Sequence, residues 1–309
     1  MIATSAASLD PAAPAVRPRI GRVAAIVNPL AHGVGPADAE ALAAIVAGFG
    51  LPLDLAAPLP HDLDAAIETA LAGSPDFLVV LAGDGTAREA ARLCGPDGPL
   101  LAILPGGTLN VLSHALYGVR PWRETLQTLL EAGVERPLSG GAVAGRPFYA
   151  AAILGSPALW APVREAVRAM ALGKAWRLGR SALSRAFAGH LRFESDQQPR
   201  CKTTGLGLIC PAVSRVFQDH QPALEAALLD QRDIAEVLRL GLHHLLGDWR
   251  ADPKVLTAPC RQGRAWARRR IPAILDGESF LLERSVAIEF KPKACRVLVP
   301  PPAAPSDAP

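Results

Sequence analysis

The sequence lacks the cysteine pattern of a zinc or redox centre. Its five cysteines are scattered along the chain, and no two of them stand in a Cys-x-x-Cys pair. This spacing excludes a zinc knuckle and a dithiol motif. We expect free, mostly buried thiols in a reducing compartment, because isolated cysteines behave there as small apolar side chains.

Long apolar runs and concentrated charge are missing as well. No uninterrupted apolar run reaches the roughly 18 residues that cross a bilayer, and the first residues lack the basic start and apolar core of a secretory signal. The net charge of +3 is modest, whereas nucleic-acid binding usually needs a concentrated basic face. We therefore expect a cytoplasmic protein that binds no nucleic acid and touches lipid only peripherally, on the inner membrane face.

What the sequence does contain is enough apolar side chains for two folded domains. Hydrophobic residues make up 50% of the 309 residues, so each of two domains can bury its own core. Both ends are rich in Ala and Pro, and we expect disorder over 1–19 and 300–309. Between them we expect an α/β domain over 20–135 and a β-rich domain over 136–299.

The first half of the chain alternates strand and helix signals. Arg22–Val27, Phe77–Ala82 and Leu100–Leu104 are short apolar runs, and helical patterns separate them. Continuous apolar strands separated by helices are typical of a parallel sheet with helices on both faces. Ligands of such sheets bind at the carboxyl ends of the strands, so the loops that follow these runs are the candidate site.

The second half has a different pattern. Strand-like segments dominate from Leu191 onward, and helical patterns near 160–188 and 233–246 interrupt the second half. These patterns predict a mostly β, sandwich-like domain with helical insertions.

Glycine-rich segments follow two of the predicted parallel strands. Gly83-Asp84-Gly85-Thr86 comes after one strand and Gly106-Gly107-Thr108 after the next, while Asn28–Gly33 forms a third polar loop at the same edge. Glycine lets the backbone approach a phosphate closely, and the amides that open the next helix can donate to its oxygens. An Asp-Gly turn after a strand is common on its own, but three such loops at one edge favour a polyphosphate site.

In these loops the sequence resembles the diacylglycerol kinase catalytic-domain family, which includes bacterial lipid kinases and the sphingosine and ceramide kinases. The resemblance covers most of residues 20–300, and its elements occur in the family's order: Asn28-Pro29 with Gly33, Gly83–Thr86 with Glu89, Leu104–Asn110, and Asp276-Gly277-Glu278. It implies ATP in the cleft between the two domains, Mg²⁺ as a cofactor, and diacylglycerol or a related lipid alcohol as the acceptor. A homodimer is compatible with this assignment.

The resemblance also implies a role for each matching residue. Asp276 would be the general base that takes the proton from the lipid hydroxyl, with Asp84 as the rival base and as a candidate Mg²⁺ ligand. Glu278 would lie near the nucleotide or the metal, and Glu89 and Asn110 would brace the loops. The contacts to ATP would come from Asn28, Gly33, Gly83, Asp84, Gly85, Thr86, Gly106, Gly107 and Thr108. A plain hairpin turn at Asp276-Gly277 is the structural alternative.

Several positions depart from the family pattern. Ala82 replaces a glycine, Arg88 precedes Glu89, Val111 follows Asn110, and Leu154–Pro157 stands where the family has Gly-Phe-Asp-Ala. The changes at Val111 and Leu154–Pro157 leave open a nucleotide- or lipid-binding relative without catalysis. An NAD-kinase-like enzyme is a further alternative because such enzymes share Gly-Asp-Gly-Thr, although the loop Pro-Gly-Gly-Thr-Leu-Asn argues against it.

Two basic runs lie in the second half. Pro162–Arg192 mixes Arg and Lys with apolar residues and has Glu165 as its only acid, while Arg261–Arg270 places Arg264 and Trp266 in the alternation of a strand edge. Solvated surfaces are the ordinary explanation for both runs. The alternative is a basic amphipathic surface that rests on an anionic membrane.

Overall fold

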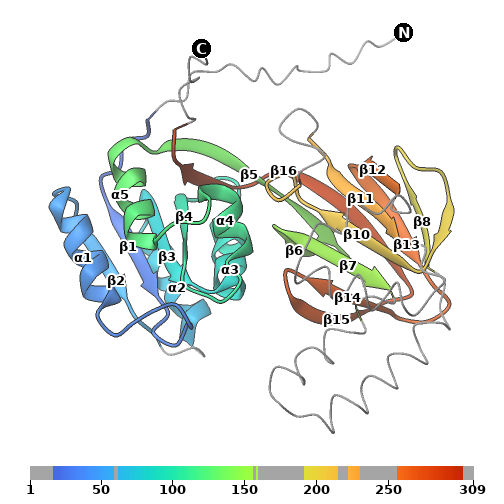
Figure 1. The fold of residues 1–309 in the computed structure, drawn as a ribbon, viewed down its shortest axis with the longest axis horizontal. Helices are drawn as coiled ribbons and strands as arrows, with labels where there is room; N and C mark the ends of the chain where they lie inside the picture. Colours follow the sequence, from blue (N-terminus) through green and yellow to red (C-terminus); the bar gives the residue numbers. More distant parts are fainter. Residues whose placement is uncertain are drawn as a thin grey trace, which may run out of the picture.

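The computed structural model describes residues 17–58, 62–155, 158, 191–214, 222–229 and 256–301. In these ranges the chain forms a ten-stranded and a six-stranded sheet. Figure 1 shows an α/β half at the N-terminal end of the chain and a half made of strands beside it. The fold class predicted from the sequence is therefore confirmed.

The α/β half is a parallel sheet covered by helices. Its strand order is β2-β1-β3-β4, with every pair parallel, and the strands are β1 (Val23–Val27), β2 (Leu53–Ala56), β3 (Phe77–Ala82) and β4 (Leu100–Pro105). The helices are α1 (Asp38–Gly48), α2 (Leu63–Ala72), α3 (Asp84–Cys94), α4 (Val111–Tyr117) and α5 (Trp122–Ala132). Every residue of β1 and β3 is buried, because both faces of the sheet are covered.

One long strand ties the two halves into a single sheet. The first part of β16 (Ser285–Val299) pairs with β13 (Gln262–Trp266), and its last part runs parallel to β4. Alongside it lies β5 (Val134–Val143), antiparallel, with a register shift between Lys291 and Cys295. The carboxyl end of the chain thus returns to the α/β half.

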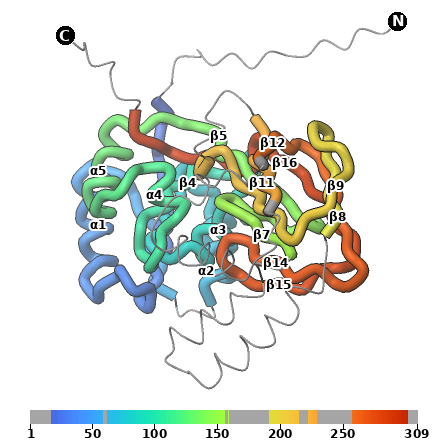
Figure 2. The backbone as a smooth tube through the Cα atoms, turned by 45° about the vertical axis from the view of Figure 1, so that its right-hand side comes forward, coloured from blue at the N-terminus to red at the C-terminus, as the bar shows by residue number. Residues whose placement is uncertain are grey.

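The second half is a sandwich of two sheets. The six-stranded sheet has the order β12-β11-β10-β7-β14-β15, and Figure 2 shows it beside the far end of the long sheet. One apolar cluster joins residues of both sheets, such as Phe193 and Ile288 from one and Leu154 and Leu208 from the other. The remaining strands are β6 (Arg146–Phe148), β7 (Ala151–Gly155), β8 (Leu191–Ser195), β9 (Cys201–Thr203), β10 (Gly205–Ile209), β11 (Leu224–Leu229), β12 (Leu256–Cys260), β14 (Ile271–Leu275) and β15 (Glu278–Leu282).

Some sequence-based expectations fall outside this description. The helical insertions near 160–188 and 233–246 and the disordered ends lie almost wholly outside the described residues, and so does most of the basic run Pro162–Arg192. Within the described ranges, no helix has the length and apolarity to cross a membrane. The domain boundary near residue 136 stays a prediction, and that residue lies within β5.

Candidate active site

Three loops of the α/β half meet at the carboxyl edge of its sheet. They follow β1, β3 and β4, which are neighbours in the sheet. The amide of Gly33 donates to the carbonyl of Gly106 at 2.9 Å, and the amide of Gly106 donates to the carbonyl of Ala82 at 3.0 Å. Main-chain hydrogen bonds thus join the Asn28–Gly33 loop to the Gly106–Thr108 loop, and the latter to the last residue of β3, directly before Gly83–Thr86.

Glycine is required where the second and third loops touch. A Cβ atom on Gly107 would lie 2.7 Å from the Cα atom of Gly83, and one on Gly106 would lie 2.8 Å from the amide nitrogen of Ala82. Both distances are too short for any side chain. The absence of side chains therefore sets the spacing between the loops and leaves main-chain groups at the edge of the sheet.

Two asparagines hold the outer loops in shape. Asn110 has a left-handed backbone (φ 51°), and its side chain accepts from the amide of Gly107 at 2.7 Å and donates to the carbonyl of the same residue at 2.9 Å. The Asn28 side-chain oxygen accepts from the amide of Leu30 at 3.0 Å. Both side chains orient loop backbone in the structure.

Helix α3 starts directly at the glycine loop. Gly83 is its extended N-cap, and Asp84, Gly85 and Thr86 form its first turn. The first amides of a helix have no acceptor within the helix and carry partial positive charge, which suits an anion. Asp84 is partly exposed, and among the described residues its carboxylate has no hydrogen bond or ion pair.

Glu89 points along its own helix. Its carboxylate accepts from the Arg92 Nε at 2.9 and 3.0 Å and also pairs with the Arg92 terminal nitrogen. The hydrogen bond with Arg92 lowers the pKa of Glu89. In the structure this carboxylate holds an arginine one helical turn away, and no hydrogen bond joins it to the glycine loops within the described residues.

The second half contributes a carboxylate fixed by main-chain donors. Asp276 and Gly277 join β14 to β15 in a tight hairpin with φ values of 45° and 92°. The Asp276 carboxylate accepts from the amides of Tyr149, Ala150 and Ala151 at 2.7, 2.9 and 2.9 Å. Asp276-Gly277 is thus a hairpin turn, as the structural alternative predicted, and main-chain amides fix the carboxylate that it carries. Its role as a base stays a prediction.

Opposing effects act on the pKa of Asp276. Burial disfavours the charged form and raises the pKa, while the three amide donors and the positive charge of Arg88 lower it. The net direction is upward. A raised pKa makes this carboxylate a stronger base than an ordinary aspartate.

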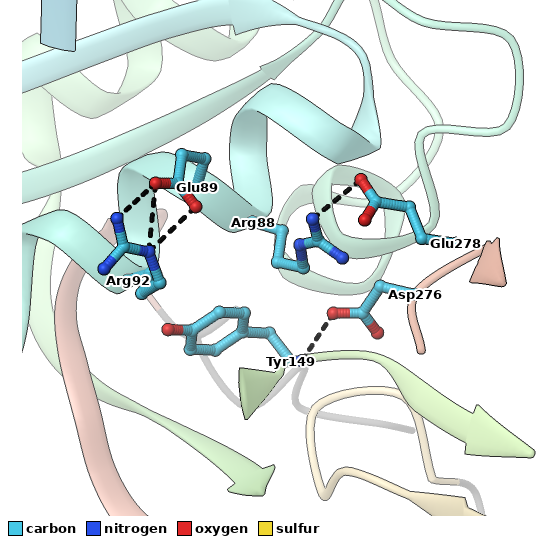
Figure 3. A network of polar contacts seen from close by, with 6 residues as sticks. All are labelled: Arg88, Glu89, Arg92, Tyr149, Asp276 and Glu278. Atoms are coloured by element: carbon cyan, nitrogen blue, oxygen red, sulfur yellow. Dashed lines mark hydrogen bonds and ion pairs between the residues drawn. The ribbon is translucent and has the colours of Figure 1, made fainter. Parts of the chain in front are cut away.

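Arg88 connects the two halves at this point. It lies on α3, and its guanidinium forms an ion pair with Glu278 of β15 at 2.7 Å. Figure 3 shows the guanidinium between the carboxylates of Glu278 and Asp276. The Arg88 side chain is only 17% exposed, and a Cβ on Gly85 would lie 3.8 Å from the Glu278 carboxylate. The hairpin therefore faces the first turns of the helix that opens at the glycine loop.

In the sequence, Arg88 stands out only as a departure from the family pattern, and no pattern predicts the amides of Tyr149–Ala151 as donors. The guanidinium finds its partner in a strand far along the chain, and main-chain donors leave no signal in the sequence. The one local signal in the sequence is an arginine only two residues after the Gly83–Thr86 loop.

The structure offers few protein ligands for a metal. Within the described ranges, no three His, Cys, Asp or Glu side chains gather in a metal-binding group. Mg²⁺ in phosphotransfer enzymes is commonly held by one or two carboxylates together with phosphate oxygens of the substrate. The single carboxylate of Asp84 at the glycine loop fits that arrangement.

Comparison with known proteins agrees with this geometry. Residues 22–140 match the model of the diacylglycerol kinase catalytic domain, so the resemblance seen in the sequence is confirmed over these residues. No curated protein matches the chain.

Solved structures share the fold across both halves. A diacylglycerol kinase from Bacillus anthracis superimposes with a TM-score of 0.68 at 16% identity, covering 93% of this chain and 99% of that one. A candidate diacylglycerol kinase from the same species gives 0.69 at 17% identity with the same coverage. At this identity the likeness establishes the fold.

Proposed function

Because residues 22–140 match the diacylglycerol kinase catalytic domain, we propose that the chain is an ATP-dependent lipid kinase. It transfers the γ-phosphoryl group to a hydroxyl of diacylglycerol or a related lipid alcohol. The observation that carries the proposal is the Arg88–Glu278 ion pair of 2.7 Å, because it places the carboxylates of the hairpin beside the helix that opens at the glycine loops.

The nucleotide would bind to the α/β half. Main-chain amides of the Gly83–Thr86 and Gly106–Thr108 loops and the N-terminus of α3 would donate to its phosphate oxygens. Asn28 and Asn110 hold the loop backbone in the conformation that this requires. Mg²⁺ would be held by the phosphates and Asp84, and would supply charge neutralisation.

The transfer itself would use the hairpin. As the acceptor oxygen bonds to the γ-phosphorus, the bond from that phosphorus to the β–γ bridging oxygen breaks and ADP leaves. Asp276 would take the proton of the acceptor hydroxyl, since its three amide bonds fix its orientation and burial raises its pKa. Asp84 remains the rival for this role.

Arg88 would act as a positioning residue in this arrangement. Its charge faces both Asp276 and Glu278, so it lowers the pKa of Asp276 against the effect of burial and holds the hairpin against α3. Glu278 is 49% exposed and would lie at the edge of the nucleotide site.

The direct test is transfer of labelled γ-phosphate from ATP to a mixed lipid extract by the wild-type chain and by Asp84→Asn and Asp276→Asn. The proposal expects a labelled lipid with the wild type and loss of the label in both variants. No labelled lipid across a broad panel of lipid alcohols would refute it. ATP-dependent formation of NADP would instead indicate an NAD kinase, and tight ATP binding without any transfer a non-catalytic relative.

A further inference from the structure

A hollow lined by arginines lies at the far end of the β half. Its volume is about 420 Å³, and its lining includes Arg200, Arg264, Arg284, Trp266 and Glu194. Arg200 precedes β9, Arg264 lies within β13, and Arg284 lies between β15 and β16. The hairpin that carries Asp276 is at the opposite end of β14, so the hollow is separate from the candidate active site.

Two of the arginines, Arg200 and Arg264, are held in place by contacts that leave their charge free. The guanidinium of Arg200 lies over the Trp266 ring at 5.0 Å from its centre, and that of Arg264 lies at 5.9 Å. Arg264 also donates through Nε to the Ser285 hydroxyl at 2.9 Å. The indole thus orders two guanidinium groups at little cost in side-chain freedom.

Positive charge in and around the hollow is poorly balanced. Glu194 is the only acid in its lining, and the register places it opposite Arg264. The neighbouring turn adds the exposed Arg268 and Arg269, and the amide of Ala267 donates to the carbonyl of Arg284 at 2.8 Å, which holds this turn against the hollow. Within the described residues, Arg200, Arg264 and Arg284 have no ion pair.

Such a cluster matches phosphate chemistry. A guanidinium presents paired N–H donors that fit the oxygens of a phosphate group, and three of them with an indole make a site for a phosphate diester or monoester. The hollow is open, and further exposed arginines lie beside it. This arrangement fits a ligand surface that carries many phosphates better than it fits one small molecule. A tryptophan beside arginines is typical of protein surfaces at the membrane interface.

We infer that this hollow docks the chain on a membrane by binding the phosphate headgroups of anionic phospholipids. The choice of a lipid surface over a soluble phosphate rests on the proposed function, because a lipid kinase must meet its acceptor at a membrane. The binding itself requires neither ATP nor turnover, so a test of docking and a test of catalysis can fail separately.

The test is co-sedimentation of the full chain, without nucleotide, with vesicles of phosphatidylglycerol or of phosphatidylcholine. The wild type is expected to bind phosphatidylglycerol vesicles at low salt, to release them at high salt, and to leave phosphatidylcholine vesicles unbound. The double variant Arg200→Gln/Arg284→Gln should bind about 25-fold more weakly, since each arginine near an anionic surface contributes about fivefold. Its melting temperature should match that of the wild type, because both side chains are exposed.

A matched double variant separates the hollow from net charge. Lys291→Gln/Lys293→Gln also removes two positive charges, but these lysines pair with Glu289 and Asp97 on another part of the surface. Its vesicle binding should stay near that of the wild type. Equal loss in both double variants, or none in the arginine variant, would overturn the proposal. If the wild-type chain binds glycerol 3-phosphate but does not bind vesicles, the hollow is a site for a soluble phosphate compound instead.

Discussion

One half contributes main-chain groups to the candidate active site, and the other half contributes side chains. The α/β half presents main-chain groups: three loops packed so closely that Gly106 and Gly107 can carry no side chain. The β half presents carboxylates, and Asp276 is held by three amides from another turn. A main-chain site depends on local glycine patterns, whereas a fixed carboxylate depends on contacts between distant segments, so the two halves respond differently to substitution.

The largest effect is expected for Asp276→Asn. The amide side chain offers one acceptor oxygen to three donors and cannot accept a proton, so phosphoryl transfer should fall by about 100- to 10,000-fold. At least one of the three buried amides also loses its acceptor, which should lower the free energy of unfolding by about 1–3 kcal/mol. Single-turnover kinetics and urea denaturation measure the two losses. Transfer within a few-fold of the wild type would reassign the base to Asp84.

A large effect on the other half is expected for Gly107→Ala. The added methyl group would push the Gly107 and Gly83 loops apart, with a strain of about 1–3 kcal/mol, and ATP affinity should fall by about 10- to 100-fold in line with that strain. Gly48→Ala is the matched control because a Cβ there meets nothing within 4 Å. It should leave affinity unchanged and stabilise α1 slightly. Equal affinity in both variants would contradict the tight packing of the loops.

An intermediate effect is expected where the halves meet, at Arg88→Gln. Burial raises the pKa of Asp276 and the Arg88 charge opposes that rise. Removing the Arg88 charge raises the pKa of Asp276 further, so Asp276 becomes protonated at a higher pH. The acidic limb of the pH–rate profile therefore moves to higher pH. The rate at neutral pH should fall about tenfold, which corresponds to a loss of about 1.4 kcal/mol of charge stabilisation. Arg88→Lys should restore the acidic limb, and an unshifted limb in Arg88→Gln would exclude this role.

The smallest effect is expected for Glu89→Gln. The Glu89 carboxylate pairs with Arg92 on the same helix, and such a pair contributes only about 0.3–0.5 kcal/mol to helix stability. Activity should stay within about threefold of the wild type, as a difference below 1 kcal/mol implies. A loss like that of Gly107→Ala would instead place Glu89 among the groups that brace the loops, as the family resemblance implies.

Sequence patterns could predict the elements whose structure depends on residues close by in the sequence. The apolar runs that became β1, β3 and β4 and the loops that follow them are placed as expected, because glycines after a buried strand indicate both the end of the strand and an exposed backbone. The Asp276-Gly277 turn was also visible, since Asp-Gly favours the backbone of a tight hairpin.

Contacts between distant segments could not be predicted in this way. The Arg88–Glu278 ion pair and the amides that hold Asp276 depend on how the two halves pack. The sequence gives no sign that β16 is one long strand, because Lys291-Pro292-Lys293 interrupts its apolar pattern. The structure absorbs this interruption as a register shift against β5, and this continuity is what brings the two halves together.

The central claim is that the α/β half binds the nucleotide and the β half acts on the acceptor. It is tested most directly by titration calorimetry, which gives the dissociation constant for ATP of Asp276→Asn and of Gly107→Ala. If the glycine loops bind the nucleotide and the hairpin acts on the acceptor, Asp276→Asn should bind ATP within about threefold of the wild type, a difference below 1 kcal/mol. Its phosphoryl transfer should nevertheless fall by about 100-fold or more. A loss of ATP affinity as large as that of Gly107→Ala in a folded Asp276→Asn chain would contradict this division.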